Sequence, residues 1–236
     1  MVHVFSAFSL VLGGIIAVIL VLVIFKPHKL LFSALFSGAA AFLIAIFIQS
    51  PIQQIPLLIL GIRTTADIII RGTTFVIIIS FYTGFIAAIF QEIFKYLFLK
   101  KGNSEYSLQV GLGFGITEVI YLAIYAFMSI AILGSIPENT GVLQYIAPGI
   151  ERFLVLLFHT LTAIYMELYG IKGLMITTAA HGAIDSLATC VQLYIRVIGY
   201  DMLSYLSILV LYFSMLALDI LLLKISLPLR SGSLAF

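Results

Sequence analysis

The stretch Val4–Phe25 reads VFSAFSLVLGGIIAVILVLVIF and contains no charged side chain. An α-helix rises about 1.5 Å per residue, so roughly 20 apolar residues cross the hydrocarbon core of a bilayer. This stretch is long enough to do so, and it is longer than the apolar region of a cleavable signal peptide. We therefore predict that it forms a membrane-spanning helix.

The rest of the chain has the same apolar character. Hydrophobic residues make up 63% of the sequence and charged residues only 9%, whereas soluble domains carry about 25% charged residues. The net charge of +2 gives no reason to expect a nucleic-acid partner, and the single cysteine, Cys190, excludes an intrachain disulfide. The composition predicts a multi-pass protein that lies in a lipid bilayer, which we assign to the cell membrane.

Seven apolar stretches are long enough to be transmembrane helices: 4–25, 30–49, 73–99, 106–133, 150–169, 172–198 and 202–223. Segment 50–71 contains two prolines and several polar residues around an apolar centre, so an interfacial helix and a re-entrant dip both remain open. The sequence shows no repeat and no linker. We predict one all-α domain over residues 1–236, a transmembrane bundle of about seven helices.

Basic residues predict how this bundle is oriented. Loops on the cytoplasmic side of a membrane protein carry an excess of lysine and arginine. One predicted side collects Lys26, Lys29, Lys95, Lys100, Lys101, Lys172, Lys224 and Arg230. The other side collects Arg63, Arg71, Arg152 and Arg196. The richer side is expected to be cytoplasmic, which places the N-terminus outside and the C-terminus in the cytoplasm.

Four ionisable side chains lie deep within the apolar stretches: Glu92, Glu118, His159 and His181, with Asp185 one turn after the last. A charge at the bilayer centre costs roughly 2.5–3.5 kcal/mol on insertion scales, so such groups usually face a bundle interior and indicate a functional site. Counted from the predicted cytoplasmic helix ends, all four lie roughly 10–20 Å deep. We therefore predict that they share one cavity.

Purely structural interpretations remain open for these groups. Glu92 can pair with Lys95 near the head groups, and Glu118 can be a neutral acid that hydrogen-bonds within the bundle. A proton-coupled carrier and a haem with two histidine ligands are further alternatives, but the polar residues do not extend to both surfaces. That distribution favours a cavity over a channel.

Glycines 111, 113 and 115 superficially resemble a nucleotide-binding loop, but no strand precedes them. Within an apolar helix, Gly111 and Gly115 instead form a surface of small residues that favours close helix packing. We predict the packing role.

The polar residues fall into four short motifs along the chain. They are Gln91-Glu92-Ile93-Phe94-Lys95, the glycine-rich helix that ends at Glu118, Glu151-Arg152 followed by His159, and His181-Gly182-Ala183-Ile184-Asp185. In this order, they resemble motifs of the PrsW and YhfC families of glutamic-type intramembrane proteases, which are distant relatives of the CAAX-processing and bacteriocin-processing (CPBP) membrane proteases. The resemblance covers about residues 75–195 and marks this region as a protease-like core.

The resemblance implies that the protein hydrolyses a peptide bond within the membrane, so we expect a membrane-embedded peptide or protein as substrate. Such hydrolysis needs a base for the water and hydrogen-bond donors for the oxyanion. Glu92 is the preferred base, with Glu118 as its partner or the alternative base. His159 is expected to orient the water or to stabilise charge. His181, held by Asp185, is expected to donate to the oxyanion, and no cofactor is expected.

Two alternatives keep the same residues. Gln91 stands where the resembled families have the glutamate that is their expected general base, and an amide is no useful base at neutral pH. The protein can therefore be a catalytically inactive, protease-like membrane scaffold. A zinc ion bound by His159, His181 and Glu92 would instead make it a metal-dependent hydrolase.

Overall fold

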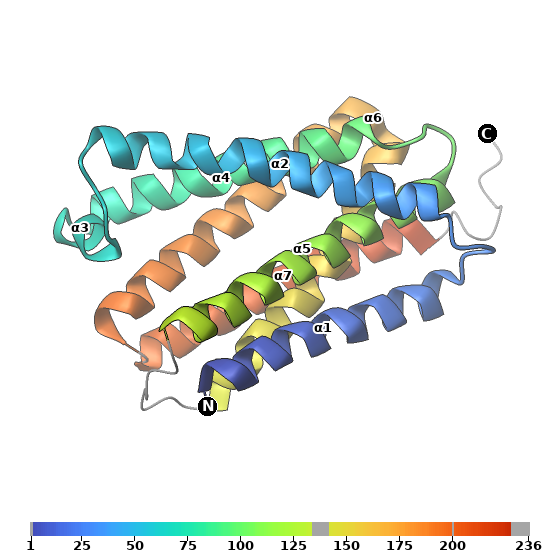
Figure 1. The fold of residues 1–236 in the computed structure, drawn as a ribbon. Helices are drawn as coiled ribbons and strands as arrows, with labels where there is room; N and C mark the ends of the chain where they lie inside the picture. The colour runs from blue at the N-terminus through green and yellow to red at the C-terminus, as the bar shows by residue number, and fades with distance from the viewer. Residues whose placement is uncertain (1, 134–141, 200, 228–236) are drawn as a thin grey trace.

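The computed structural model describes residues 2–133, 142–199 and 201–227 (Figure 1). These residues form seven α-helices and no strand: α1 (Val2–Phe25), α2 (Phe32–Ile59), α3 (Thr65–Ile70), α4 (Thr73–Leu97), α5 (Ser104–Leu133), α6 (Val142–Ile198) and α7 (Met202–Ser226). Six of them are long and apolar enough to cross a membrane. The prediction of an all-α, multi-pass membrane bundle is therefore confirmed.

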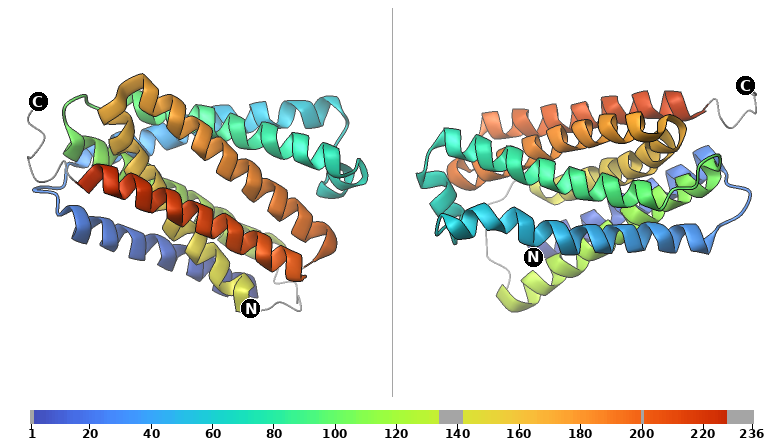
Figure 2. Two further views of the ribbon diagram at one scale, coloured as in Figure 1. Left: turned by 180° about the vertical axis from the view of Figure 1, so that it is seen from behind. Right: turned by 90° about the horizontal axis from the view of Figure 1, so that it is seen from above.

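Helix α6 contains two of the predicted spans, 150–169 and 172–198. It runs for 57 residues, and its apolar part would extend about 75 Å as one straight helix, far beyond the roughly 30 Å of a hydrocarbon core. At Gly170 the backbone adopts φ 58° and ψ −133°, a conformation that interrupts the helix. The chain turns back there, so α6 consists of an N-terminal leg (142–169) and a C-terminal leg (171–198) (Figures 1 and 2).

The N-terminal leg begins earlier than predicted. Helical structure starts at Val142 and passes through Pro148, so the second half of the predicted loop 134–149 is helix. Residues 134–141 of that loop, and Arg230 of the predicted cytoplasmic side, lie outside the described residues. The side chain of Arg196 is also outside the description.

Segment 50–71, which the sequence left undecided, is the continuation of α2 followed by α3. Proline cannot donate the hydrogen bond to the residue four before it, so Pro56 leaves the carbonyl of Ile52 without its helical partner. The hydroxyl of Tyr82 donates to that carbonyl at 2.8 Å, which allows α2 to continue to Ile59. The segment is thus a helix end and a short surface helix rather than a dip into the bundle.

Helix α3 begins with a capping box. The side chain of Thr64 accepts a hydrogen bond from the backbone N–H of Asp67, and the carboxylate of Asp67 accepts from the N–H of Thr64. Backbone N–H groups of Arg63 and Thr64 donate to that carboxylate, so the pKa of Asp67 is held below its usual value. The cap fixes where the chain turns between α2 and α4.

The N-terminal leg of α6 is the central element of the bundle. Its Ile164 packs with α1, its Leu154 with α7, and its His159 contacts α4 and α5. Figures 1 and 2 show both legs of α6 within the bundle. Residues 158–164 of this leg are all buried, and so are Leu154, Leu156 and Met166. Side chains on this leg are therefore shielded from lipid on most sides, which is where an ionisable group in a membrane can be accommodated.

Close approach between α5 and the N-terminal leg depends on glycine. A methyl group built on Gly111 would lie 2.5 Å from the carbonyl oxygen of His159 and 2.7 Å from Cβ of Ala163. On Gly115 it would lie 3.0 Å from the side chain of Leu156. The predicted packing role of the glycines is confirmed, and the contact occurs at the level of His159.

Replacing Gly111 with alanine should lower the stability of the protein, because the added methyl group overlaps the backbone of the central leg. Overpacking of this kind costs about 1–3 kcal/mol, so we expect a lower melting temperature in detergent. Ala131→Val enlarges an exposed position of the same helix and should leave the melting temperature unchanged. Equal stability of Gly111→Ala and wild type would contradict the close contact.

Candidate active site

The first half of the site is a buried ion pair on α4. Glu92 and Lys95 lie one helical turn apart, and both side chains have 0% exposure. Lys95 Nζ donates to Glu92 Oε1 at 2.9 Å and to Thr162 Oγ1 at 2.9 Å, and it lies 3.0 Å from His159 Nδ1. The ammonium group thus connects α4 to the N-terminal leg of α6.

Glu92 also binds the C-terminal leg. Its Oε1 lies 2.8 Å from Nδ1 of His181, whose Nε2 lies 3.4 Å from Asp185 Oδ2 one turn later. The rings of His159 and His181 are 5.2 Å apart, and the phenyl ring of Phe158 packs against both. One carboxylate therefore links both legs of α6 to α4, directly at His181 and through Lys95 at His159.

The second half of the site is centred on Glu118 of α5. Its Oε1 accepts a hydrogen bond from Nη1 of Arg152 at 2.6 Å. Its Oε2 lies 2.9 Å from Nε2 of His159, a distance typical of an ion pair, although the atoms are not aligned for a hydrogen bond. The other arm of Arg152 donates to Glu151. His159 thus stands between Lys95 on one side and Glu118 on the other.

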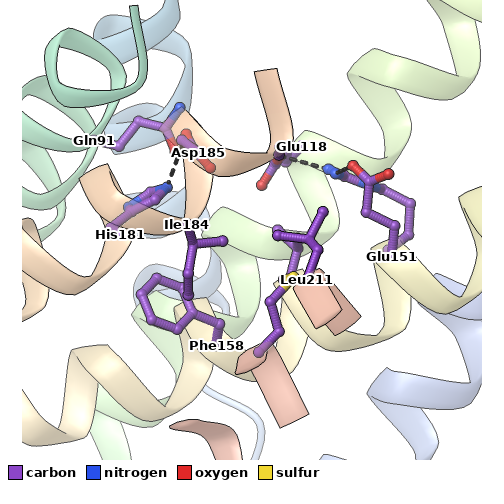
Figure 3. Close-up of a pocket in the computed structure, with 12 residues that line it drawn as sticks. Gln91, Glu118, Glu151, Phe158, His181, Ile184, Asp185 and Leu211 are labelled. Atoms are coloured by element: carbon purple, nitrogen blue, oxygen red, sulfur yellow. Dashed lines mark hydrogen bonds and ion pairs between the residues drawn. The ribbon is translucent and has the colours of Figure 1, made fainter. Parts of the chain in front are cut away.

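A pocket of about 50 Å³ opens onto part of this network (Figure 3). One ordered water needs about 10–15 Å³ by this measure, so the pocket has room for a few water molecules. Its ionisable lining consists of Glu118, Glu151, Arg152, His181 and Asp185. Glu92 and His159 do not line it.

The structure brings together all five residues predicted to form the site: Glu92, Glu118, His159, His181 and Asp185. The pocket is smaller than the cluster, because Glu92 and His159 are enclosed by Lys95 and the aromatic rings. Which of the five take part in chemistry stays a prediction.

Two members of the network lie elsewhere than the sequence predicted. Arg152 was expected near the outer surface, yet it is only 8% exposed and bonded to Glu118. Arg152 precedes His159 by seven residues, or two helical turns, and this spacing indicates that both side chains lie on the same helix face. Lys95 was expected near the head groups, but it is fully buried, and its ammonium lies over the rings of Phe114 and Phe158.

Gln91 lines the pocket on the side of Asp185 (Figure 3). It is 7% exposed, and its Oε1 has no hydrogen-bond partner among the described residues. A buried amide oxygen without a partner is costly unless water or a ligand binds it. Gln91 is therefore a candidate binding group at this position.

The residues proposed as zinc ligands meet only in part the needs of a metal ion. One donor atom each of Glu92, His159 and His181 lies within 4.8 Å of the others. However, the Lys95 ammonium already contacts Glu92 Oε1 and His159 Nδ1. A zinc ion that bound these two atoms would have to displace Lys95.

No family model, curated protein or solved structure matches this chain. The resemblance to the PrsW and YhfC families therefore rests on the four ordered motifs and stays a prediction. Each motif contributes at least one side chain to the polar network: Glu92, Glu118, His159 and His181.

Replacing Lys95 with methionine should destabilise the protein, because the carboxylate of Glu92 would remain buried without its main partner. Breaking a buried pair in this way costs about 3–5 kcal/mol. The double variant Lys95→Met/Glu92→Gln should recover part of that loss, as measured by thermal unfolding in detergent. Lys101→Met, an exposed lysine, is the control. Additive losses in the double variant would show that the two groups are not coupled.

Proposed function

We propose that this protein is an intramembrane endopeptidase that hydrolyses a peptide bond with an activated water. One observation carries the proposal. Glu118 and His181 line one pocket inside a transmembrane bundle, with room for a few water molecules. A second carboxylate, Glu92, lies 2.8 Å from Nδ1 of His181. A carboxylate that orients an imidazole toward water is a common arrangement for general acid–base catalysis.

Glu92, His181 and Asp185 are assigned as one proton-transfer unit. Glu92 has Lys95 and His181 Nδ1 on the same oxygen, which favours the ionised carboxylate and an Nδ1–H that donates to it. Nε2 of His181 lies 3.4 Å from Asp185 Oδ2, and a carboxylate beside this nitrogen favours an N–H there as well. The imidazole is therefore a donor that can stabilise an oxyanion, and the pocket-lining carboxylate of Asp185 takes the proton from water. Glu92 thereby acts through His181 rather than as the base that the sequence favoured, because it does not line the pocket.

Glu118 and Arg152 are assigned to hold the water and the developing charge. Arg152 neutralises Glu118 through a 2.6 Å hydrogen bond and also lines the pocket, so its guanidinium can stabilise an oxyanion. The water oxygen adds to the carbonyl carbon while its proton passes to the carboxylate of Asp185. That proton then goes to the amide nitrogen as the C–N bond breaks, which releases an amine and a carboxylic acid.

The substrate class and the location follow from the membrane context. A pocket enclosed by membrane-spanning helices favours a substrate that is itself in the bilayer, and the motif resemblance favours a peptide. We propose the cell membrane as the location, with the N-terminus outside and the C-terminus in the cytoplasm, on the distribution of basic residues.

A second candidate, a membrane scaffold without catalytic activity, is favoured by two observations. Gln91 replaces an expected acid, and Lys95 is fully engaged between Glu92, His159 and Thr162. Such a network would hold three helical segments together even if no reaction occurred. It predicts a stable protein that cleaves no peptide.

His181→Ala and Glu118→Gln should each lower peptide cleavage about 10²–10⁴-fold, the usual contribution of a general acid–base group. The measurement uses the full chain in lipid vesicles with membrane-spanning peptides, and mass spectrometry identifies the products. Glu167→Gln is the matched control, since Glu167 binds Gly102 and Ser104 at a turn away from the site. Undiminished cleavage by both site variants would exclude these roles, and an inactive wild type would favour the scaffold.

Removal of metal ions should leave cleavage unchanged, because the Lys95 ammonium already contacts Glu92 Oε1 and His159 Nδ1 and the proposed reaction uses no metal. Purified protein treated with a chelator is assayed on the same peptides, and its metal content is measured in parallel. One zinc per chain, together with lost activity that zinc restores, would establish the metal-dependent alternative.

A further inference from the structure

A second pocket lies at the end of the bundle where α1 and α7 end and α5 begins (Figure 1). Its volume is about 300 Å³, at the lower limit of typical small-molecule sites, about 300–1,000 Å³. It shares no lining residue with the pocket of the candidate active site. Because membrane-spanning helices end around it, the pocket lies at the level where lipid head groups begin.

The polar lining carries both signs of charge. Lys26 and His28, from the turn after α1, supply a cation and an imidazole. Glu105 supplies a carboxylate from the first turn of α5, and Ser226 adds a hydroxyl from the last turn of α7. A ligand that fills this pocket should therefore present an anionic group and a cationic group close together.

The remaining lining is apolar. Phe25, Leu108 and Ile164 come from α1, α5 and α6, and their side chains pack in or against one core cluster. A polar rim above an apolar floor suits an amphiphile better than a small ion. The glycerol and first methylene groups of a lipid match such a floor.

Lys26 is held in an unfavourable backbone conformation. Its φ is 38°, and it is the only non-glycine residue with positive φ in the described part of the chain. It follows the last residue of α1, and its N–H donates to the carbonyl of Leu22 at 3.0 Å, a helix-ending position that usually belongs to glycine. A lysine at a strained position suggests that its ammonium has a function there.

We propose that this pocket binds the head group of phosphatidylethanolamine. Lys26 and His28 contact the phosphate, and Glu105 accepts hydrogen bonds from the primary ammonium. The apolar floor of Leu108 and Ile164 holds the glycerol end. The site is independent of the proposed hydrolase activity, since it shares no residue with that pocket.

The test is native mass spectrometry of the full chain in detergent with equal amounts of phosphatidylethanolamine, phosphatidylcholine and phosphatidylglycerol. We expect phosphatidylethanolamine to bind best, because choline has no N–H donor for Glu105 and phosphatidylglycerol has no cation. Lys26→Gly should weaken binding about tenfold, the usual effect of losing a charged hydrogen-bond partner. Glycine suits the backbone at this position, so the melting temperature should not fall.

Further variants make the outcome decisive. Glu105→Gln should remove the preference over phosphatidylcholine, whereas Lys101→Gln, in a neighbouring turn outside the pocket, should change nothing. Equal or better binding of phosphatidylglycerol would overturn the proposal, as would displacement of the lipid by millimolar inorganic phosphate. Undiminished binding by Lys26→Gly, or an equal loss in Lys101→Gln, would overturn it too.

Discussion

The buried ion pair between Glu92 and Lys95 is the interaction on which the arrangement of the helices depends. Neither side chain is exposed, so each charge has lost its hydration and must be compensated by the protein. A lysine ammonium has three protons, and in this structure three groups surround it: Glu92, His159 and Thr162. The contacts of the ammonium with His159 and Thr162 hold α4 against the N-terminal leg of α6. The contact of Glu92 with His181 holds the C-terminal leg.

Such a network needs helix backbones that approach closely, and glycine makes this possible. Gly111 brings α5 against the backbone at His159, which sets the distance from Glu118 to that imidazole. Gly84 plays the same part between α4 and the C-terminal leg, where a side chain would overlap Ser186. The polar groups therefore meet because small residues lie beside them on the same helices.

The network has an enclosed part and a part that faces the pocket. Glu92 and Lys95 are sealed from the pocket, whereas Glu118, His181 and Asp185 line it. This division matches the proposed reaction, in which the enclosed charges hold the imidazole in position and the facing groups contact water and substrate. It also explains why a carboxylate that looks catalytic in the sequence can serve a positioning role.

Much of this fold is determined by local properties of the sequence. Long apolar stretches specify membrane-spanning helices, because an isolated backbone in lipid must satisfy its own hydrogen bonds. The constant rise of a helix predicts a similar depth for Glu92, Glu118, His159 and His181 from their positions along the chain alone. Ionisable groups at that depth must face one another, so their clustering was also predictable.

Only the tertiary structure decided which atoms pair. Arg152 was predicted at the surface but bonds Glu118, and Lys95 was predicted near the head groups but lies between two helices. The continuation of α2 past Pro56 depends on a hydroxyl from Tyr82, which is distant in sequence. Depth follows from position along one helix, whereas pairing depends on how several helices rotate and pack against one another, and no single stretch of sequence contains that information.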